Sequence, residues 1–174
     1  IGKINTLTDE QIAKYVNHFP KNITPFMDVT YPSDERAIRT DMVNIIRRAC
    51  NQGLMISTYG TVSVRWREND FLITPRDVAR WDILPEDIVQ IKSGMAEAGK
   101  IPSRSVALHH RIYQLNPHIN SIIVTQSTNL MAHAVSHQKF DVRTIPESWI
   151  FLQDVPSIPF EKLYNNMEEI AEMF

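Results

Sequence analysis

The hydrophobic period of this chain changes at Gly53, and that change limits the possible folds more than any other feature. Before Gly53, a helix capped by Ser33 is predicted, because apolar residues recur at helical spacing. These residues are Ile38, Met42, Ile45, Ile46 and Ala49. After Gly53, apolar and polar residues alternate over 62–67, and a turn at 68–70 leads into Phe71–Ile73, which predicts a β-hairpin. Hairpin strands are antiparallel, so an all-parallel sheet is excluded.

Strand and helix patterns alternate through the rest of the chain. Strands are predicted at Ile88–Lys92, Ile119–Val124 and Val155–Phe160, and helices at Ser105–Leu115, Thr128–His137 and Glu161–Phe174. Together with the hairpin, this order predicts a layered α/β domain with a largely antiparallel central sheet.

The first 33 residues differ from the rest. Thr8 is a plausible cap for a short helix that runs to His18, and Phe19–Pro32 contains three prolines without a sustained period. We therefore interpret residues 1–33 as a helix followed by an arm or linker, and residues 34–174 as the domain itself.

Composition excludes several classes of function. The 174 residues suit one domain, and 43% apolar with 22% charged residues is ordinary for a globular chain. A net charge of -2 gives no basic patch for nucleic acid or anionic lipid, and no apolar run reaches the length of a membrane span. No signal-peptide pattern is present, so a cytoplasmic location is the default expectation. Cys50 is expected to be a buried structural thiol.

Several segments resemble the class II aldolase/adducin family, in particular fuculose-phosphate aldolases, over roughly residues 38–160. They are Ile56–Arg65, Leu72–Pro75, Leu84–Val89, Pro102-Ser103, Leu108-His109 and Ile112-Tyr113. The resemblance implies a three-layer α/β/α fold with a mainly antiparallel central sheet. In the family's enzymes, zinc polarises a sugar-phosphate carbonyl and a glutamate moves the proton.

The resemblance also places the metal ligands, and the chain departs from them. Two of three zinc ligands form a His-x-His strand end, which here falls on Val124 and Gln126. Valine has no lone pair and an amide oxygen is a poor zinc ligand, so we expect neither a metal site nor a cofactor in this chain, although catalytic relatives use zinc. The third ligand would follow the last helix, and we expect the domain to be incomplete at its C-terminal end. The start at Ile1 favours a fragment of a longer polypeptide.

The proton-transfer and phosphate positions differ as well. The glutamate of the family's Pro-Ser-Ser-Glu motif falls on Ser105, whose hydroxyl does not titrate near neutral pH, so no catalytic residue is predicted. The phosphate loops fall on Tyr59-Gly60-Thr61 and on Thr74-Pro75-Arg76-Asp77, where Asp77 opposes an anion and Arg76 offsets it. The candidate substrate-binding residues are Gly60, Thr61, Thr74, Arg76, Ser103 and Arg104.

These departures predict a non-catalytic domain with a structural, assembly or regulatory role. The expected partners are further copies of the chain or an adjacent aldolase-like domain, with Trp81 or Trp149 as interface anchors. One alternative is a divergent aldolase or epimerase whose metal site is completed by another domain or chain. The other is a module that binds a small anionic sugar through Arg65, Arg76 and Arg104.

Two histidine patterns could suggest metal or ligand binding, but surface exposure or packing explains them more simply. His133 and His137 are four residues apart on a predicted helix, but no carboxylate or cysteine motif accompanies them, which favours surface or helix-end histidines. His109 lies where the family often has a histidine for packing, and we expect packing here too.

Overall fold

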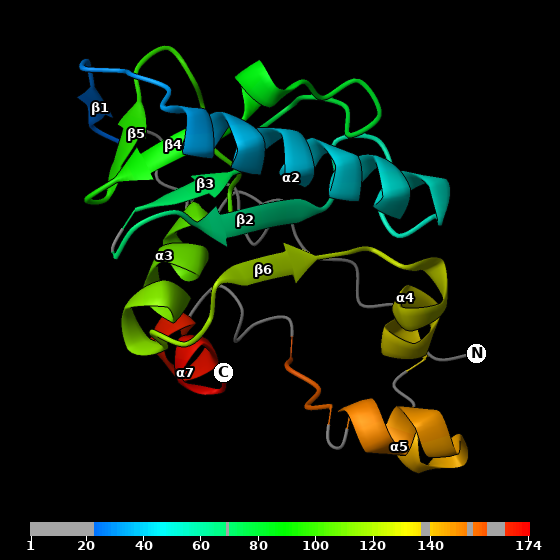
Figure 1. The fold of residues 1–174 in the computed structure, drawn as a ribbon. Helices are drawn as coiled ribbons and strands as arrows, with labels where there is room; N and C mark the ends of the chain where they lie inside the picture. Colours follow the sequence, from blue (N-terminus) through cyan, green and yellow to red (C-terminus); the bar gives the residue numbers. More distant parts are fainter. Residues whose placement is uncertain (1–22, 69, 137–139, 153–154, 160–165) are drawn as a thin grey trace, which may run out of the picture.

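A six-stranded sheet organises the fold in a computed structural model, which describes residues 23–68, 70–136, 140–152, 155–159 and 166–174 (Figure 1). The strand order is β1-β5-β4-β3-β2-β6. Every neighbouring pair is antiparallel except β1 with β5. The prediction of a mainly antiparallel sheet is therefore confirmed.

The predicted hairpin forms the centre of this sheet. Strand β2 (Thr61–Arg65) pairs with β3 (Phe71–Ile73), with Val64 opposite Leu72. Strand β4 (Val89–Lys92) extends the sheet beside β3, and β6 (Ser121–Val124) lies on the other side of β2. Both strands were predicted from their apolar runs, and each begins within two residues of its predicted first residue.

Two strands were not predicted. Strand β5 (Met95–Glu97) returns beside β4 after a tight turn, in which Ser93 and Gly94 have φ angles of 49° and 80°. Two successive positive φ angles are the signature of a two-residue hairpin turn. Strand β1 (Pro25–Phe26), within the segment interpreted as an arm, pairs with β5. The predicted helix at 8–18 lies outside the described residues.

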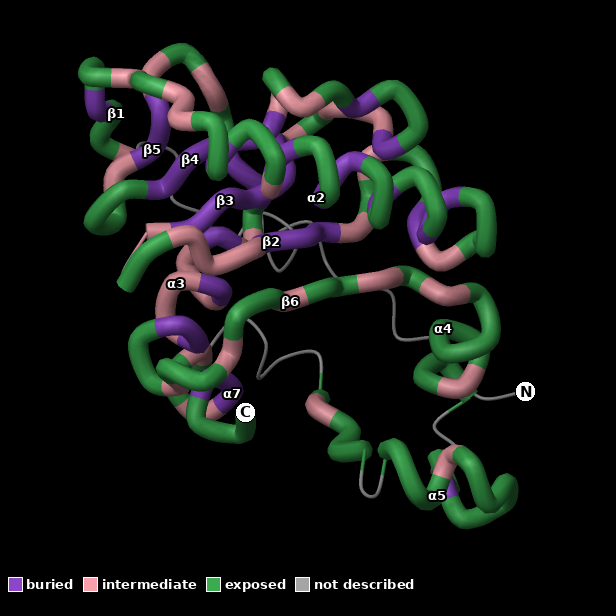
Figure 2. The backbone as a smooth tube through the Cα atoms, viewed as in Figure 1, coloured by how far each residue is buried: buried purple, intermediate pink, exposed green. Residues whose placement is uncertain are grey.

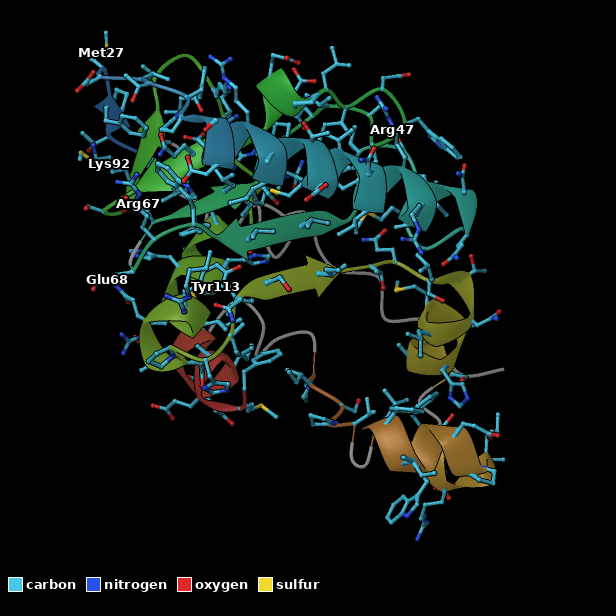
Figure 3. All side chains as sticks on the ribbon, viewed as in Figure 1. Met27, Arg47, Arg67, Glu68, Lys92 and Tyr113 are labelled. Atoms are coloured by element: carbon cyan, nitrogen blue, oxygen red, sulfur yellow. The ribbon has the colours of Figure 1, made fainter. Side chains whose placement is uncertain are left out.

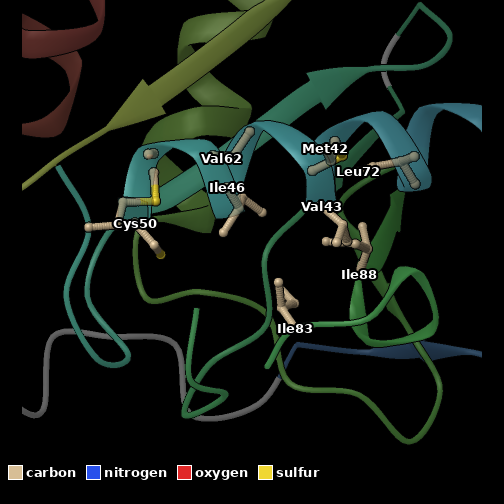
Figure 4. Packing of buried hydrophobic residues seen from close by; sticks show 10 residues of the cluster. Met42, Val43, Ile46, Cys50, Val62, Leu72, Ile83 and Ile88 are labelled. Carbon is tan, nitrogen blue, oxygen red and sulfur yellow. The ribbon is translucent and has the colours of Figure 1, made fainter. Parts of the chain in front are cut away.

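One helix covers one face of the sheet. Helix α2 (Ser33–Asn51) packs Met42, Val43 and Ile46 against Val62 and Leu72, and all five are at most 2% exposed (Figure 4). Cys50 is buried in the same cluster, as predicted. The predicted Ser33 cap is wrong: Pro32 occupies the N-cap position and no side chain caps the helix.

The opposite face carries helix α3 (Val106–Leu115), which contacts α7 (Met167–Glu172). Val106 and Tyr113 pack there against Phe71, Ile73 and Val89. Helices on both faces complete the three layers implied by the resemblance.

The region after β6 departs most from the prediction. Helix α4 (Thr128–Val135) was predicted, but the turn η2 (Val142–Thr144) and helix α5 (Pro146–Leu152) were not. The predicted strand at 155–160 is wrong for residues 155–159, which have no strand pairing; its last residue lies outside the described part. Of the predicted helix at 161–174, α7 is described and residues 161–165 are not. None of the described helices is both long and apolar enough to span a bilayer.

A buried ion network joins α2 to the β4–β5 hairpin. Arg39 is 3% exposed, and its guanidinium bonds to Glu35 Oε1 at 2.8 Å and to Glu97 Oε2 at 3.1 Å. Lys100 Nζ lies 2.7 Å from Glu97 Oε1, and Tyr31 donates to the same carboxylate. Burial alone would raise the pKa of Glu97, but the hydrogen bonds from Lys100 and Tyr31 outweigh it and lower that pKa. Two cations therefore balance two buried carboxylates.

Candidate functional site

Three hydroxyl groups meet where β2 begins and α3 begins. Thr61 Oγ1 and Ser103 Oγ are 2.8 Å apart, Ser103 Oγ and Ser105 Oγ 3.2 Å, and Ser105 Oγ and Thr61 Oγ1 3.4 Å. Thr61 and Ser103 are buried, and Ser105 is half-buried. The structure thus brings together three of the positions singled out from the sequence, and their hydroxyls bond mainly to one another.

The loops beside this hydroxyl triad are held by a residue that the sequence did not point to. Arg80 is 2% exposed and donates to three backbone carbonyls: Gly60 O at 2.9 Å, Val78 O at 2.7 Å and Pro75 O at 3.2 Å. Burial lowers its pKa. Arg80 therefore clamps the two loops that the resemblance assigned to phosphate. It follows no periodic pattern, and no local signal separates it from a surface arginine.

Gly60 is required by its conformation and by its neighbours. Its φ is 94°, and a Cβ there would lie 2.7 Å from Met55 Cγ and 3.3 Å from Val124 O. The first contact requires the Met55 side chain to move and the second is tight against a backbone oxygen, so a side chain at this positive φ would be strained.

The second loop supplies one unsatisfied donor. Thr74 is fully buried, and its hydroxyl accepts a long 3.4 Å bond from Val62 N. The backbone of Arg76 donates to Ile101 O at 2.8 Å, but its side-chain Nε is buried with no hydrogen-bond partner. Asp77 is exposed with φ 60°. Arg104, the remaining candidate, is exposed next to Ser103.

The end of β6 lies directly beside the triad. Val124 is opposite Thr61 in the sheet and 42% exposed, and Gln126 is exposed with its backbone N bonded to Leu54 O at 3.0 Å. In the described part of the chain, no three His, Cys, Asp or Glu residues are grouped to hold a metal ion. The donor set at this strand end does not fit zinc, which takes imidazole, thiolate or carboxylate ligands.

A second polar cluster lies deeper between β2 and α3. Ser63 Oγ is 2.7 Å from His109 Nδ1 and 2.7 Å from Tyr113 OH. Tyr113 is labelled in Figure 3. Ser63 and His109 are fully buried, and His109 Nε2 has no partner. Burial lowers the pKa of His109 to about 4 and raises that of Tyr113 to about 12. Both groups are therefore neutral packing residues at pH 7.

The other arginine and histidine candidates are not part of the triad. The Arg65 guanidinium donates to the carbonyls of Ile119, Tyr113 and Asn116 at 2.8–3.1 Å, a structural role. His133 stacks edge-on against Phe140, with ring centroids 5.6 Å apart, beside a hollow of about 270 Å³. His137 lies outside the described residues.

Comparison with known proteins identifies the fold. Residues 40–174 match the family described as Class II Aldolase and Adducin N-terminal domain. This chain belongs to that family.

Two relatives named as aldolases show how far the similarity extends. The chain is 30% identical over 120 residues to 5-methylthioribulose-1-phosphate/5-deoxyribulose-1-phosphate aldolase of Escherichia coli O45:K1. The aligned region covers 68% of this chain and 56% of that protein. It is 26% identical over 121 residues to L-fuculose phosphate aldolase of Methanococcus vannielii. This alignment covers 69% of this chain and 65% of that aldolase. The chain therefore spans less than two thirds of the length of either relative.

A solved class II aldolase structure confirms the fold. The crystal structure of L-fuculose-1-phosphate aldolase from Thermus thermophilus superposes with a TM-score of 0.65 at 23% identity, covering 79% of this chain and 71% of that one. At this identity the likeness concerns the fold alone.

Proposed function

We propose that this class II aldolase domain does not itself cleave carbon–carbon bonds and instead has a structural, assembly or regulatory role. The observation that carries the proposal is the hydroxyl triad. The resemblance assigns the acid/base glutamate to Ser105, and the Ser105 hydroxyl bonds to Ser103 and Thr61. A general acid or base needs a pKa near the working pH, and a serine hydroxyl is far from that range.

The strand end supports the same proposal. Aldol cleavage in this family requires an electrophile that stabilises the enediolate oxygens. Val124 and Gln126, at the positions of two metal ligands, offer no lone pair and one weak amide oxygen respectively. We derive no step through a metal in this chain.

The alternative function is that of a divergent aldolase or epimerase. It is supported by relatives named as an aldolase and as a 3-oxo-tetronate 4-phosphate decarboxylase. In that alternative, another chain or domain would supply both the acid/base group and the metal ligands. This requires two separate groups to enter one site, whereas the structural role requires none.

A second candidate is a small-anion binding module, and one observation favours it. The Arg76 Nε donor is buried without a hydrogen-bond partner, and Pro75 forms a β-bridge with Pro102, next to Ser103 of the triad. An unpaired buried donor is costly, and an anion oxygen would satisfy it. The exposed Asp77 carboxylate weakens this site, so the candidate stands second.

The proposal is tested on metal content and turnover together. We expect the purified chain to hold far less than one zinc per chain and to show no zinc-dependent cleavage of ketose 1-phosphates. The double variant Val124→His/Gln126→His restores two imidazoles at the strand end and should bind zinc at least about tenfold more tightly than the parent. Stoichiometric zinc in the parent chain, lost on Gln126→Ala, would contradict the proposal, as would metal-dependent turnover by the parent.

A further inference from the structure

Residues 23–31, here called the strap, lie along the β5 edge of the sheet. Ala96 N donates to Thr24 O at 3.1 Å, and Ala98 N donates over the same 3.1 Å to Phe26 O. Figure 2 shows buried parts of β1, β5 and β4 next to one another at this edge. The strap is therefore bonded to the sheet, although the family match begins only at residue 40.

Few buried contacts hold the strap in place. Among residues 23–31 only Phe26 is buried, and strand β1 is two residues long. Ile23 adds a partly buried contact with the core cluster around Phe71. Segments with few buried apolar contacts open locally at a free energy well below that of global unfolding. The strap is such a segment.

Tyr31 fastens the end of the strap to the buried ion network. Its hydroxyl donates to Glu97 and accepts from Lys100 Nζ at 3.3 Å, and the centre of its ring lies 4.5 Å from Arg39 Cζ. Burial and the hydrogen bond to Glu97 raise the pKa of Tyr31 to about 12, so it is uncharged at pH 7. Its departure leaves the two cations and two carboxylates of the network balanced. Opening the strap thus avoids the cost of an unpaired buried charge.

The strap also holds the first half of the loop at residues 98–103, which leads from β5 to the hydroxyl triad. Ala98, the first residue of this loop, donates to the strap carbonyl of Phe26. Lys100 Nζ lies 5.4 Å from the centre of the Tyr31 ring. Both contacts are lost when the strap opens.

The second half of the loop carries Ser103 of the triad. Ser103 N donates to Thr74 O at 3.0 Å. Arg76 N donates to Ile101 O at 2.8 Å. These two bonds join the loop to the other side of the candidate site. Because Ile101 directly follows Lys100, a change at Lys100 reaches these bonds through the backbone.

We propose that the strap opens as one unit while the rest of the domain stays folded, and that its opening loosens the loop that carries Ser103 of the hydroxyl triad. The strap is then a conformational control built into the fold. A ligand that prefers one of two states shifts the population towards that state, so contact with the open strap changes the site without touching it. This inference goes beyond the proposed non-catalytic role and applies equally to the enzyme alternative.

Amide hydrogen exchange, followed by NMR at increasing urea concentration, tests whether the strap and the loop open together. The amides of Ala96 and Ala98 report on the strap, and those of Arg76 and Ser103 report on the loop. Leu72, fully buried in the central strand β3, reports on global unfolding. We expect the strap and loop amides to share one free energy of opening, below that of Leu72.

The variant Tyr31→Phe keeps the ring and removes the hydroxyl that donates to Glu97. It should speed the exchange of the strap and loop amides at least about tenfold, because a hydrogen bond to a charged group is lost. Tyr59→Phe is the matched control, since it removes the hydroxyl of a tyrosine that is 54% exposed, and it should leave these rates unchanged. Circular dichroism checks that both variants are folded.

Three results would overturn the inference. The strap amides could exchange only at the level of Leu72, in which case the strap does not open separately. Tyr31→Phe could leave all the rates unchanged, or it could speed the strap amides while the loop amides keep the parent rate. An aldol cleavage assay on the same samples tests the proposed function separately, because activity contradicts the non-catalytic role whether or not the strap opens.

Discussion

At the scale of single residues, the loops beside the candidate site are fixed by Gly60 and Arg80, while the hydroxyls at the site bond to one another. Gly60 makes a turn with a positive φ that favours glycine, and Arg80 holds that turn by donating to the Gly60 carbonyl. Ser105, by contrast, is satisfied by neighbouring hydroxyls. The residues that shape the site are thus separable from those that would do chemistry in it.

Gly60→Ala should destabilise the domain by about 3 kcal/mol. The substitution combines a left-handed φ with a Cβ that presses on Met55 and on Val124 O. Gly53→Ala is the matched control, because Gly53 has φ 69° but nothing within 4 Å of its Cβ position; its cost should be about 1 kcal/mol. Urea unfolding measures both, and equal losses would show that the contacts of Gly60 are irrelevant.

His109 should make the domain sensitive to mild acid. Its folded pKa of about 4 lies below the ordinary 6.5, so the unfolded chain binds the proton first. The contribution of neutral His109 to the free energy of unfolding is therefore fully present above pH 6.5. It is lost as the pH falls towards 4, which lowers the free energy of unfolding by about 3 kcal/mol in all. Burial also lowers the pKa of His110, so His110 adds to the same loss.

The variant His109→Gln removes this titration and should flatten the dependence of the unfolding free energy between pH 6.5 and 4. His118→Gln, which removes an exposed imidazole, is the control and should keep the parent's acid sensitivity. Most of this window lies above 4.5, the ordinary pKa of glutamate, so Glu97, whose pKa is lowered, contributes only at its acid end. Identical pH profiles for His109→Gln and the parent would refute the assignment.

At the scale of elements, the β4–β5 hairpin is attached to α2 by ions as well as by apolar packing. Arg39 from the helix reaches Glu97 on β5 and the carbonyls of Pro85 and Ile88. Removing a single member of a buried ion network leaves the other charges without compensation.

Arg39→Met should therefore destabilise the domain by about 3–5 kcal/mol. Arg36→Met, one turn earlier on the same helix, removes an exposed arginine with one bond to Tyr31 O and should cost less than about 1 kcal/mol. Chemical denaturation measures the free energy of unfolding of both variants and of the parent. A loss for Arg39→Met no larger than that for Arg36→Met would mean that the network contributes little to stability.

At the scale of the whole molecule, the sequence anticipated those parts whose packing is periodic. The stripe on α2 and the alternation in β2 predicted both elements, because one face of each must reach the core. Strand β5 was missed since Met95–Glu97 is too short to show a period. Helix α5 was missed since its exposed Trp149-Ile150-Phe151-Leu152 run shows no polar face.

The candidate site divides in the same way. The sequence alone determined which side chains occupy the candidate positions, because Ser105, Val124 and Gln126 cannot become a carboxylate or imidazoles in any fold. Only the tertiary structure decided what surrounds them. The hydroxyl triad and the Arg80 clamp join residues up to 44 positions apart in the chain. Such contacts depend on which strands become neighbours, and local residue patterns carry no information about that pairing.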